Sequence, residues 1–178
     1  DVTLSSFGTY GCDNNSWYPL GQTGFKVDGA ASDWYECGLM IGTDAAHISD
    51  GIRNLAAEFD GDFAISPGGN ITLSAPGGIA NEETFARFND SRAENPIGMD
   101  VTQQSYEFTS SSRNDFVILR YIVRNSTGGS ISSAYLGLYM DWDILVYSSN
   151  RGAWEPGDQM LWSCYNDGFT ENRYRGVA

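Results

Sequence analysis

The sequence is poor in the residues and motifs on which common enzyme chemistries depend. Its 178 residues include a single histidine, His47, and a single lysine, Lys26. The glycine-rich nucleotide-binding motifs, the HExxH motif of zinc peptidases and the GxSxG motif of serine hydrolases are absent. No motif flanks His47, so a hydrolase with a histidine base has no support, and we expect that the chain is not an enzyme. A glycosidase built on two carboxylates stays open as a less favoured alternative, because only the separation of such a pair in space would identify it.

Positive charge is also scarce. The 23 aspartates and glutamates face 10 lysines and arginines, which gives a formal net charge of −13. An acidic chain repels nucleic-acid phosphates, so we exclude nucleic acid as a partner. The same field attracts metal cations and favours solubility.

Long apolar runs are missing as well. The longest strong run, 116–123, is interrupted by Arg120 and is far shorter than the ~20 residues that cross a bilayer. We therefore expect no membrane insertion. The chain begins at Asp1 directly before a strand-like segment, as an exported product does after cleavage, which favours a secreted or cell-surface location.

The three cysteines lack the spacing of a metal site. Cys12, Cys37 and Cys164 form no CxxC pair. Cys12 and Cys37 flank an aromatic, glycine-rich loop, and a disulfide between them would stabilise the fold by about 3 kcal/mol in an oxidising compartment. Cys164 is then expected to be a buried, unpaired thiol.

Most of the sequence shows the residue pattern of β-strands. Apolar residues make up 41 % of the chain, enough for a core, and 21 glycines supply many turns. The pattern predicts strands at 2–9, 34–42, 62–66, 70–74, 83–89, 99–108, 114–125, 134–143, 160–166 and 172–177. Short strands with frequent turn signals favour an all-β fold: one domain over 1–178, an antiparallel β-sandwich with long loops and at most one short helix.

The pattern also predicts how some of these segments pair. Pro67, Gly68 and Gly69 indicate a hairpin between 62–66 and 70–74. The segment 114–125 is apolar on both faces, so we expect it in the middle of a sheet, forming the core hairpin with 134–143. The only candidate for the short helix is 45–59.

Two acidic groups are candidate metal sites. Glu58, Asp60 and Asp62 alternate, so their carboxylates share one side of an extended chain and suit Ca²⁺, which binds six to eight oxygens. Asp141 and Asp143 bracket Trp142 in the same way. Each group is equally compatible with a solvated acidic segment.

Tryptophans in polar loops are candidate ligand-binding residues. Trp17 and Trp154 lie in glycine-containing polar segments, where an exposed indole would stack on a sugar ring. A place in the core is the simpler interpretation of most other aromatic residues.

Several segments together resemble an accessory β-sandwich domain of secreted bacterial proteins. They are TLSSFGTYG, YECGLMIGT, ISDGIRN, RFNDSRAENPIGMDVTQQSYEF, NDFVILRYIVRNSTGGSISSAYLGLYMDWDI and YRGVA. In that family the domain is found with subtilisin-like peptidase domains and before type IX secretion sorting tails. The resemblance implies an extracellular, non-catalytic role and a domain that continues past the position of Ala178, so that this chain would be a fragment or a processed piece.

These observations give a ranked set of functions. We expect a structural or interaction domain that joins copies of itself, or other protein chains, through exposed strand edges, braced by Ca²⁺. The alternative is a carbohydrate-binding module. A hydrolase ranks last.

Overall fold

The computed structural model describes residues 2–12, 24–27, 32–52, 61–166 and 172–178. Within these ranges the chain is almost entirely β-structure, and its one helical element is a three-residue 3-10 turn, η1 (Tyr147–Ser149), so no described helix could cross a membrane. The strands are β1 (Thr9–Cys12), β2 (Trp34–Asp44), β3 (His47–Asp50), β4 (Ala64–Ile65), β5 (Thr72–Ser74), β6 (Glu82–Asn89), β7 (Met99–Glu107), β8 (Val117–Asn125), β9 (Tyr135–Trp142), β10 (Asn150–Glu155), β11 (Met160–Asn166) and β12 (Asn172–Val177).

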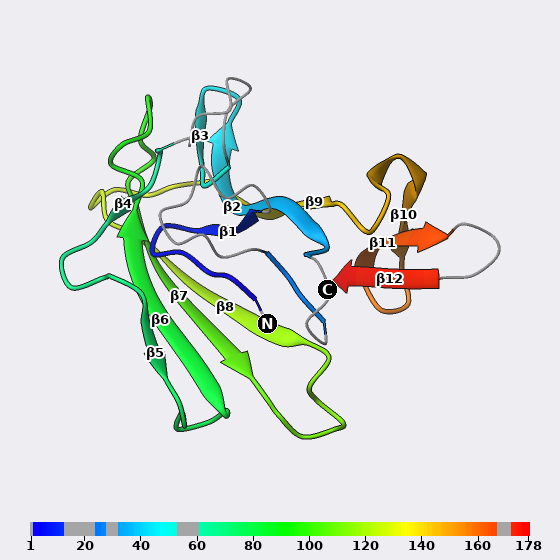
Figure 1. Ribbon diagram of the computed structural model, residues 1–178. Helices are drawn as coiled ribbons and strands as arrows, with labels where there is room; N and C mark the ends of the chain where they lie inside the picture. The colour runs from blue at the N-terminus through cyan, green and yellow to red at the C-terminus, as the bar shows by residue number, and fades with distance from the viewer. Residues whose placement is uncertain (1, 13–23, 28–31, 53–60, 167–171) are drawn as a thin grey trace.

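The strands form three antiparallel sheets (Figure 1). In the first, β2 carries β1 and β3 along one edge and β9 along the other. In the second, β6, β7 and β8 are neighbours, and the short strands β4 and β5 both pair with β6. These two sheets pack together, and the third, β10-β11-β12, lies beside them at the right of Figure 1. The predicted all-β, sandwich-like fold is confirmed.

The core lies between the first two sheets. Alternate side chains of β7 point inward, as the period of a strand requires. Met99 and Val101 of β7 pack with Leu39 and Ile41 of β2 and with Phe88 of β6, all of them buried. Burying five side chains of this size is the main source of stability, at roughly 1.5–3 kcal/mol each.

A buried carboxylate adds a polar link across this core. Asp90 is 2 % exposed and follows β6. Its side chain accepts the backbone N–H of Ile97 at 2.6 Å and of Met99 at 2.8 Å, and the hydroxyl of Ser49 in β3 at 3.3 Å. Hydrogen bonds to a charged acceptor are the strong ones, so Asp90 fixes the connection between β6 and β7 and ties it to the other sheet.

The predicted core hairpin is wrong. β8 pairs only with β7 and β9 only with β2 among the described residues, so the two strands lie in different sheets. β8 is consequently an edge strand and not the centre of a sheet. The connection 126–134 is too long for a tight turn, and Asn125 stabilises it by donating to the carbonyl of Gly129 at 2.7 Å.

The hairpin predicted around Pro67 is wrong too. β4 and β5 pair with β6 instead of with each other. Gly69, between them, accepts the N–H of Arg87 in β6 at 2.9 Å, so the segment continues along one strand. Gly68 has φ of +70°, the left-handed conformation that glycine adopts without strain. The turn therefore interrupts an extended segment and does not reverse it.

The described part of 45–59 is a strand and not a helix. His47–Asp50 form β3, which pairs antiparallel with β2. The carboxylate of Asp44 accepts the N–H of Ala46 at 2.8 Å and of His47 at 3.1 Å, which reverses the chain directly after β2. Residues 53–60 lie outside the described ranges.

The remaining strand predictions hold with small shifts. β2, β6, β7, β8, β9, β11 and β12 lie where the alternation places them. The segment predicted at 2–9 instead makes isolated bridges at Val2 and Leu4, and the regular strand β1 begins at Thr9. β10 was not expected, because its sequence NRGAWE does not alternate.

Candidate functional site

The sandwich is well filled on one side and open on the other. Its fully buried side chains come mainly from β1, β2, β6 and β7. The inner side chains of β8 and β9 are only half-buried, among them Leu119, Tyr121, Leu138 and Met140. Each of these two strands ends its sheet, so neither has a further strand to cover it in the described chain. We call this region, between the edges of β8 and β9, the open side.

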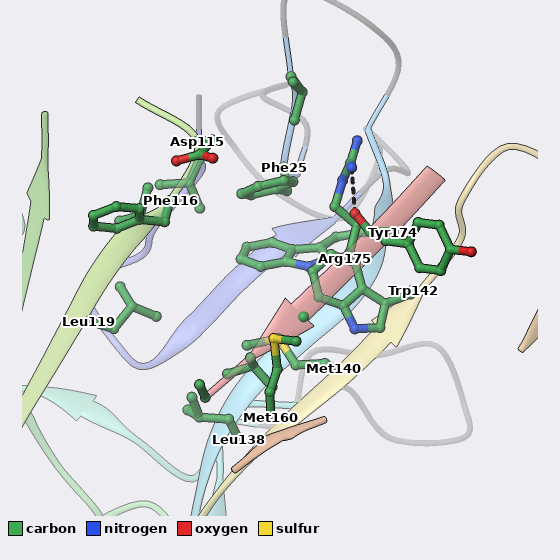
Figure 2. Close-up of a pocket in the computed structure, with 17 residues that line it drawn as sticks. Phe25, Asp115, Phe116, Leu119, Leu138, Met140, Trp142, Met160, Tyr174 and Arg175 are labelled. Atoms are coloured by element: carbon green, nitrogen blue, oxygen red, sulfur yellow. Dashed lines mark hydrogen bonds between the residues drawn. The ribbon is translucent and has the colours of Figure 1, made fainter. Parts of the chain in front are cut away.

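A cavity of about 580 Å³ lies at the open side. Figure 2 shows Phe116 and Leu119 on the β8 side of it and Met140 and Trp142 on the β9 side. Trp34 also lines it. The volume is within the range of small-molecule and peptide pockets, and the wall is mostly apolar.

The third sheet closes one end of this cavity. Arg173 and Arg175 of β12 both form ion pairs with Asp33, the residue before β2; the Arg173 Nη1 to Asp33 Oδ1 distance is 3.1 Å. Asp33 is 1 % exposed. The guanidinium of Arg175 also lies 5.7 Å from the centre of the Phe25 ring, a cation–π distance. This contact holds β12 over the aromatic residues that line the cavity.

Two buried polar groups of the lining residues lack acceptors. The indole N–H of Trp34 and the Nε of Arg175 have no hydrogen-bond partner among the described residues. An unsatisfied buried donor costs about 1–3 kcal/mol. Both nitrogens are closed off from solvent, so this cost belongs to the fold and does not reach the cavity surface. The surface that the cavity offers to an occupant is therefore mostly apolar.

The two tyrosine hydroxyls near the open side also contact each other. Tyr10 of β1 and Tyr121 of β8 form a short hydrogen bond across the two sheets. Burial raises the pKa of both phenols above the usual value of about 10, so both stay neutral at physiological pH. They act as a structural link and leave no charge in the core.

Of the first acidic group, only Asp62 is described; Glu58 and Asp60 lie outside the described ranges. The Asp62 carboxylate accepts the backbone N–H of Asp50 at 3.0 Å. Burial raises the pKa of Asp50, and the nearby charge of Asp62 raises it further. The structure thus brings together two carboxylates, of which sequence reasoning identified one.

The second acidic group lies at the end of β9. Asp141 is opposite Glu36 of β2, and the N–H of Asp143 donates to the carbonyl of Asp33 at 3.0 Å. The described residues contain no group of three histidine, cysteine, aspartate or glutamate side chains that could hold a metal. A Ca²⁺ site at either acidic group stays a prediction.

The predicted aromatic ligands are partly described. Trp17 lies outside the described ranges, whereas Trp154 of β10 is 56 % exposed. Sequence reasoning gave no role to a nearby recess of about 480 Å³, which Trp162 and Tyr174 line together with Glu155. The two rings meet edge to face at 5.8 Å. Since neighbours on a strand point to opposite faces, Trp154 faces away from the recess that Glu155 lines.

The disulfide between Cys12 and Cys37 stays a prediction. The backbone of Cys12, in β1, pairs opposite Glu36, directly beside Cys37 in β2. The side chain of Cys12 is outside the described part of the structure. Cys164, in β11, is a buried thiol.

His47 has a local role in the turn between β2 and β3. Its Nδ1 lies 2.9 Å from the Asp44 carboxylate, and both side chains are exposed. The hydrogen bond from His47 lowers the pKa of Asp44, with a further contribution from the N–H of Ala46. The pair thus reinforces the turn that reverses the chain.

No protein-family model, curated protein or solved structure matches this chain. The resemblance to an accessory domain of secreted bacterial proteins therefore stays a prediction.

Removing the Asp33 carboxylate tests the contact that closes the cavity. We expect Asp33→Ala to lower the free energy of unfolding by about 2–3 kcal/mol, because two partly buried arginines lose the buried carboxylate with which they pair. Backbone amides of β12 should exchange with solvent faster in the variant. Denaturant unfolding and hydrogen-exchange mass spectrometry measure the two effects. Asp158→Ala, in the exposed turn between β10 and β11, is the control, and unchanged β12 protection in Asp33→Ala would contradict the assignment.

Proposed function

We propose that this chain is a non-catalytic, extracellular structural or interaction domain that binds another protein chain, or a second copy of itself, through its open side. The observation that carries the proposal is the pair of edge strands, β8 and β9, whose inner apolar side chains stay half-buried. An extended segment added to such an edge gains main-chain hydrogen bonds and covers apolar surface at once.

The chemistry of the cavity supports a polypeptide occupant. Its wall offers apolar surface to side chains, and the free edges of β8 and β9 offer main-chain groups to a backbone. Asp115 and Arg175 are the charged residues of its described lining. An apolar wall with so few charges favours binding over acid–base chemistry.

A neutral probe peptide tests the open side directly. We expect a soluble peptide of about ten residues, alternating valine with threonine, to bind and to protect the amides of β8 from exchange. Leu119→Lys, which places a charge on the inner face of β8, should abolish binding, whereas Ile118→Lys, on the outer face, should retain it. Isothermal calorimetry measures binding, and circular dichroism checks that both variants fold.

Self-association is the second form of the same proposal. If the occupant is another copy, the mass measured by light scattering should rise with concentration for the wild type and Ile118→Lys but not for Leu119→Lys. Absence of both peptide binding and self-association in the wild type would remove the proposal.

We further propose that Ca²⁺ braces the acidic loop before β4. The mutual repulsion of Asp50 and Asp62 supports this, because a cation between carboxylates would offset it. Saturating Ca²⁺ should raise the Tm by about 5 °C, and EDTA should reverse the rise. Asp62→Asn should remove the effect and Asp141→Asn should keep it if the loop is the site. A Tm that does not respond to EDTA or Ca²⁺ would contradict the proposal.

Carbohydrate binding is the second candidate function, favoured by the recess at Trp162 and Tyr174. Tyr174 is 55 % exposed, so a sugar ring can stack on it while Glu155 accepts hydroxyl hydrogen bonds. We expect hits on a glycan array that Tyr174→Ala abolishes and that Trp154→Ala, on the opposite face, retains. An array without hits would remove this candidate.

A further inference from the structure

The outer face of β8 carries an unusual charge for so acidic a chain. Ile118, Arg120, Ile122 and Arg124 alternate along it and are exposed. Arg120 donates to the neutral Gln104 side chain at 3.0 Å. Neither Arg120 nor Arg124 forms an ion pair among the described residues. On the β7 side Asp100 is the cross-strand neighbour of Arg124, whereas Arg120 lies opposite the neutral Gln104.

We infer that the open side recognises an extended segment of another protein, which pairs with β8. This segment carries two acidic residues that are separated by four positions in its sequence. This inference rests on the proposed function and specifies the partner. A strand beside β8 sets its outward side chains directly opposite those of β8, at about 5 Å. Carboxylates opposite Arg120 and Arg124 therefore lie four residues apart in either strand direction, with apolar side chains between them opposite Ile122.

The inward side of the same segment must be apolar. Its side chains would cover Leu119, Tyr121 and Val123 of β8, which are half-buried, and reach into the cavity beside Met140. Asp115 stands at the cavity lining beyond the start of β8, so an acidic residue at that end of the partner would be repelled. The acidic positions therefore belong at the other end, opposite Arg120 and Arg124.

The same arginines argue against a second β8 as the occupant. In an antiparallel pair of β8 strands, Arg120 and Arg124 of one copy lie directly or diagonally beside those of the other. Like charges in these positions destabilise the pair, and charged side chains on an edge strand are a known guard against self-pairing. An acidic partner turns the repulsion into attraction.

Two charged versions of the neutral valine–threonine peptide test the inference. One carries glutamate at two outward positions four apart, and the other carries lysine at the same positions. We expect the glutamate peptide to bind about tenfold more tightly than the lysine peptide at 0.15 M salt, from the sum of two cross-strand charge pairs. The net charge of the chain alone predicts the opposite order, and salt at about this concentration screens charges more than about 8 Å away.

Charge reversal on the protein provides the matched control. Arg120→Glu with Arg124→Glu should invert the preference to the lysine peptide. Arg87→Glu with Arg151→Glu changes the net charge equally, on exposed residues of β6 and β10, and should leave the preference for glutamate intact. All four positions are exposed, and circular dichroism verifies folding.

The outcomes separate the two levels of the argument. A wild type that binds the glutamate and lysine peptides equally, or that prefers lysine, overturns the acidic partner and leaves the open side as a binding edge. If the control substitutions Arg87→Glu and Arg151→Glu also invert the peptide preference, the acidic partner is overturned as well, because the effect would then come from net charge. A wild type that binds none of the three peptides and does not self-associate removes the proposed function itself.

Discussion

The buried carboxylate of Asp33 is the contact on which the shape of the open side depends. It lies directly before β2, the central strand of its sheet, and pairs with Arg173 and Arg175 of β12. A buried charge is tolerated only with counter-charges close by, so the two arginines are obliged to remain there. Because they are two residues apart on one strand, both point to the same face, and β12 is held over Phe25 and the cavity. One carboxylate thus decides where the third sheet lies.

The second constraint is that both sheets end on the same side of the sandwich. β8 and β9 follow each other in the chain, but the long connection between them carries β9 to the other sheet instead of allowing a hairpin. Two sheet edges are therefore left next to one another, and the space between them is lined by aromatic and aliphatic side chains. The free edges of β8 and β9 add main-chain hydrogen-bonding groups beside this apolar space. Together these features favour an extended polypeptide over a purely apolar ligand.

Sequence reasoning located most strands but not their partners. Alternation placed β6, β7, β8 and β9 well, because side-chain direction has a period of two in any strand. Pairing depends on which face each neighbour covers, and the apolar outer residues Ile118 and Ile122 made β8 look central when it is an edge. Asp33 and Arg173 are 140 positions apart and belong to no motif, so no local pattern could have joined them. The recess at Trp162 likewise depends on the register of β11 and β12.

The arginines of β8 bear on how an open strand edge avoids pairing with copies of itself. An uncovered strand with apolar side chains on both faces would pair with any copy of itself, unless the edge carries charge. Like charges at Arg120 and Arg124 oppose the symmetric pairing of two β8 strands. Asp100 already lies opposite Arg124 on the β7 side. On the free side of β8, carboxylates four residues apart on a neighbouring strand would lie opposite both guanidinium groups. The two arginines that disfavour self-pairing of the edge would thus also make the edge selective for an acidic partner.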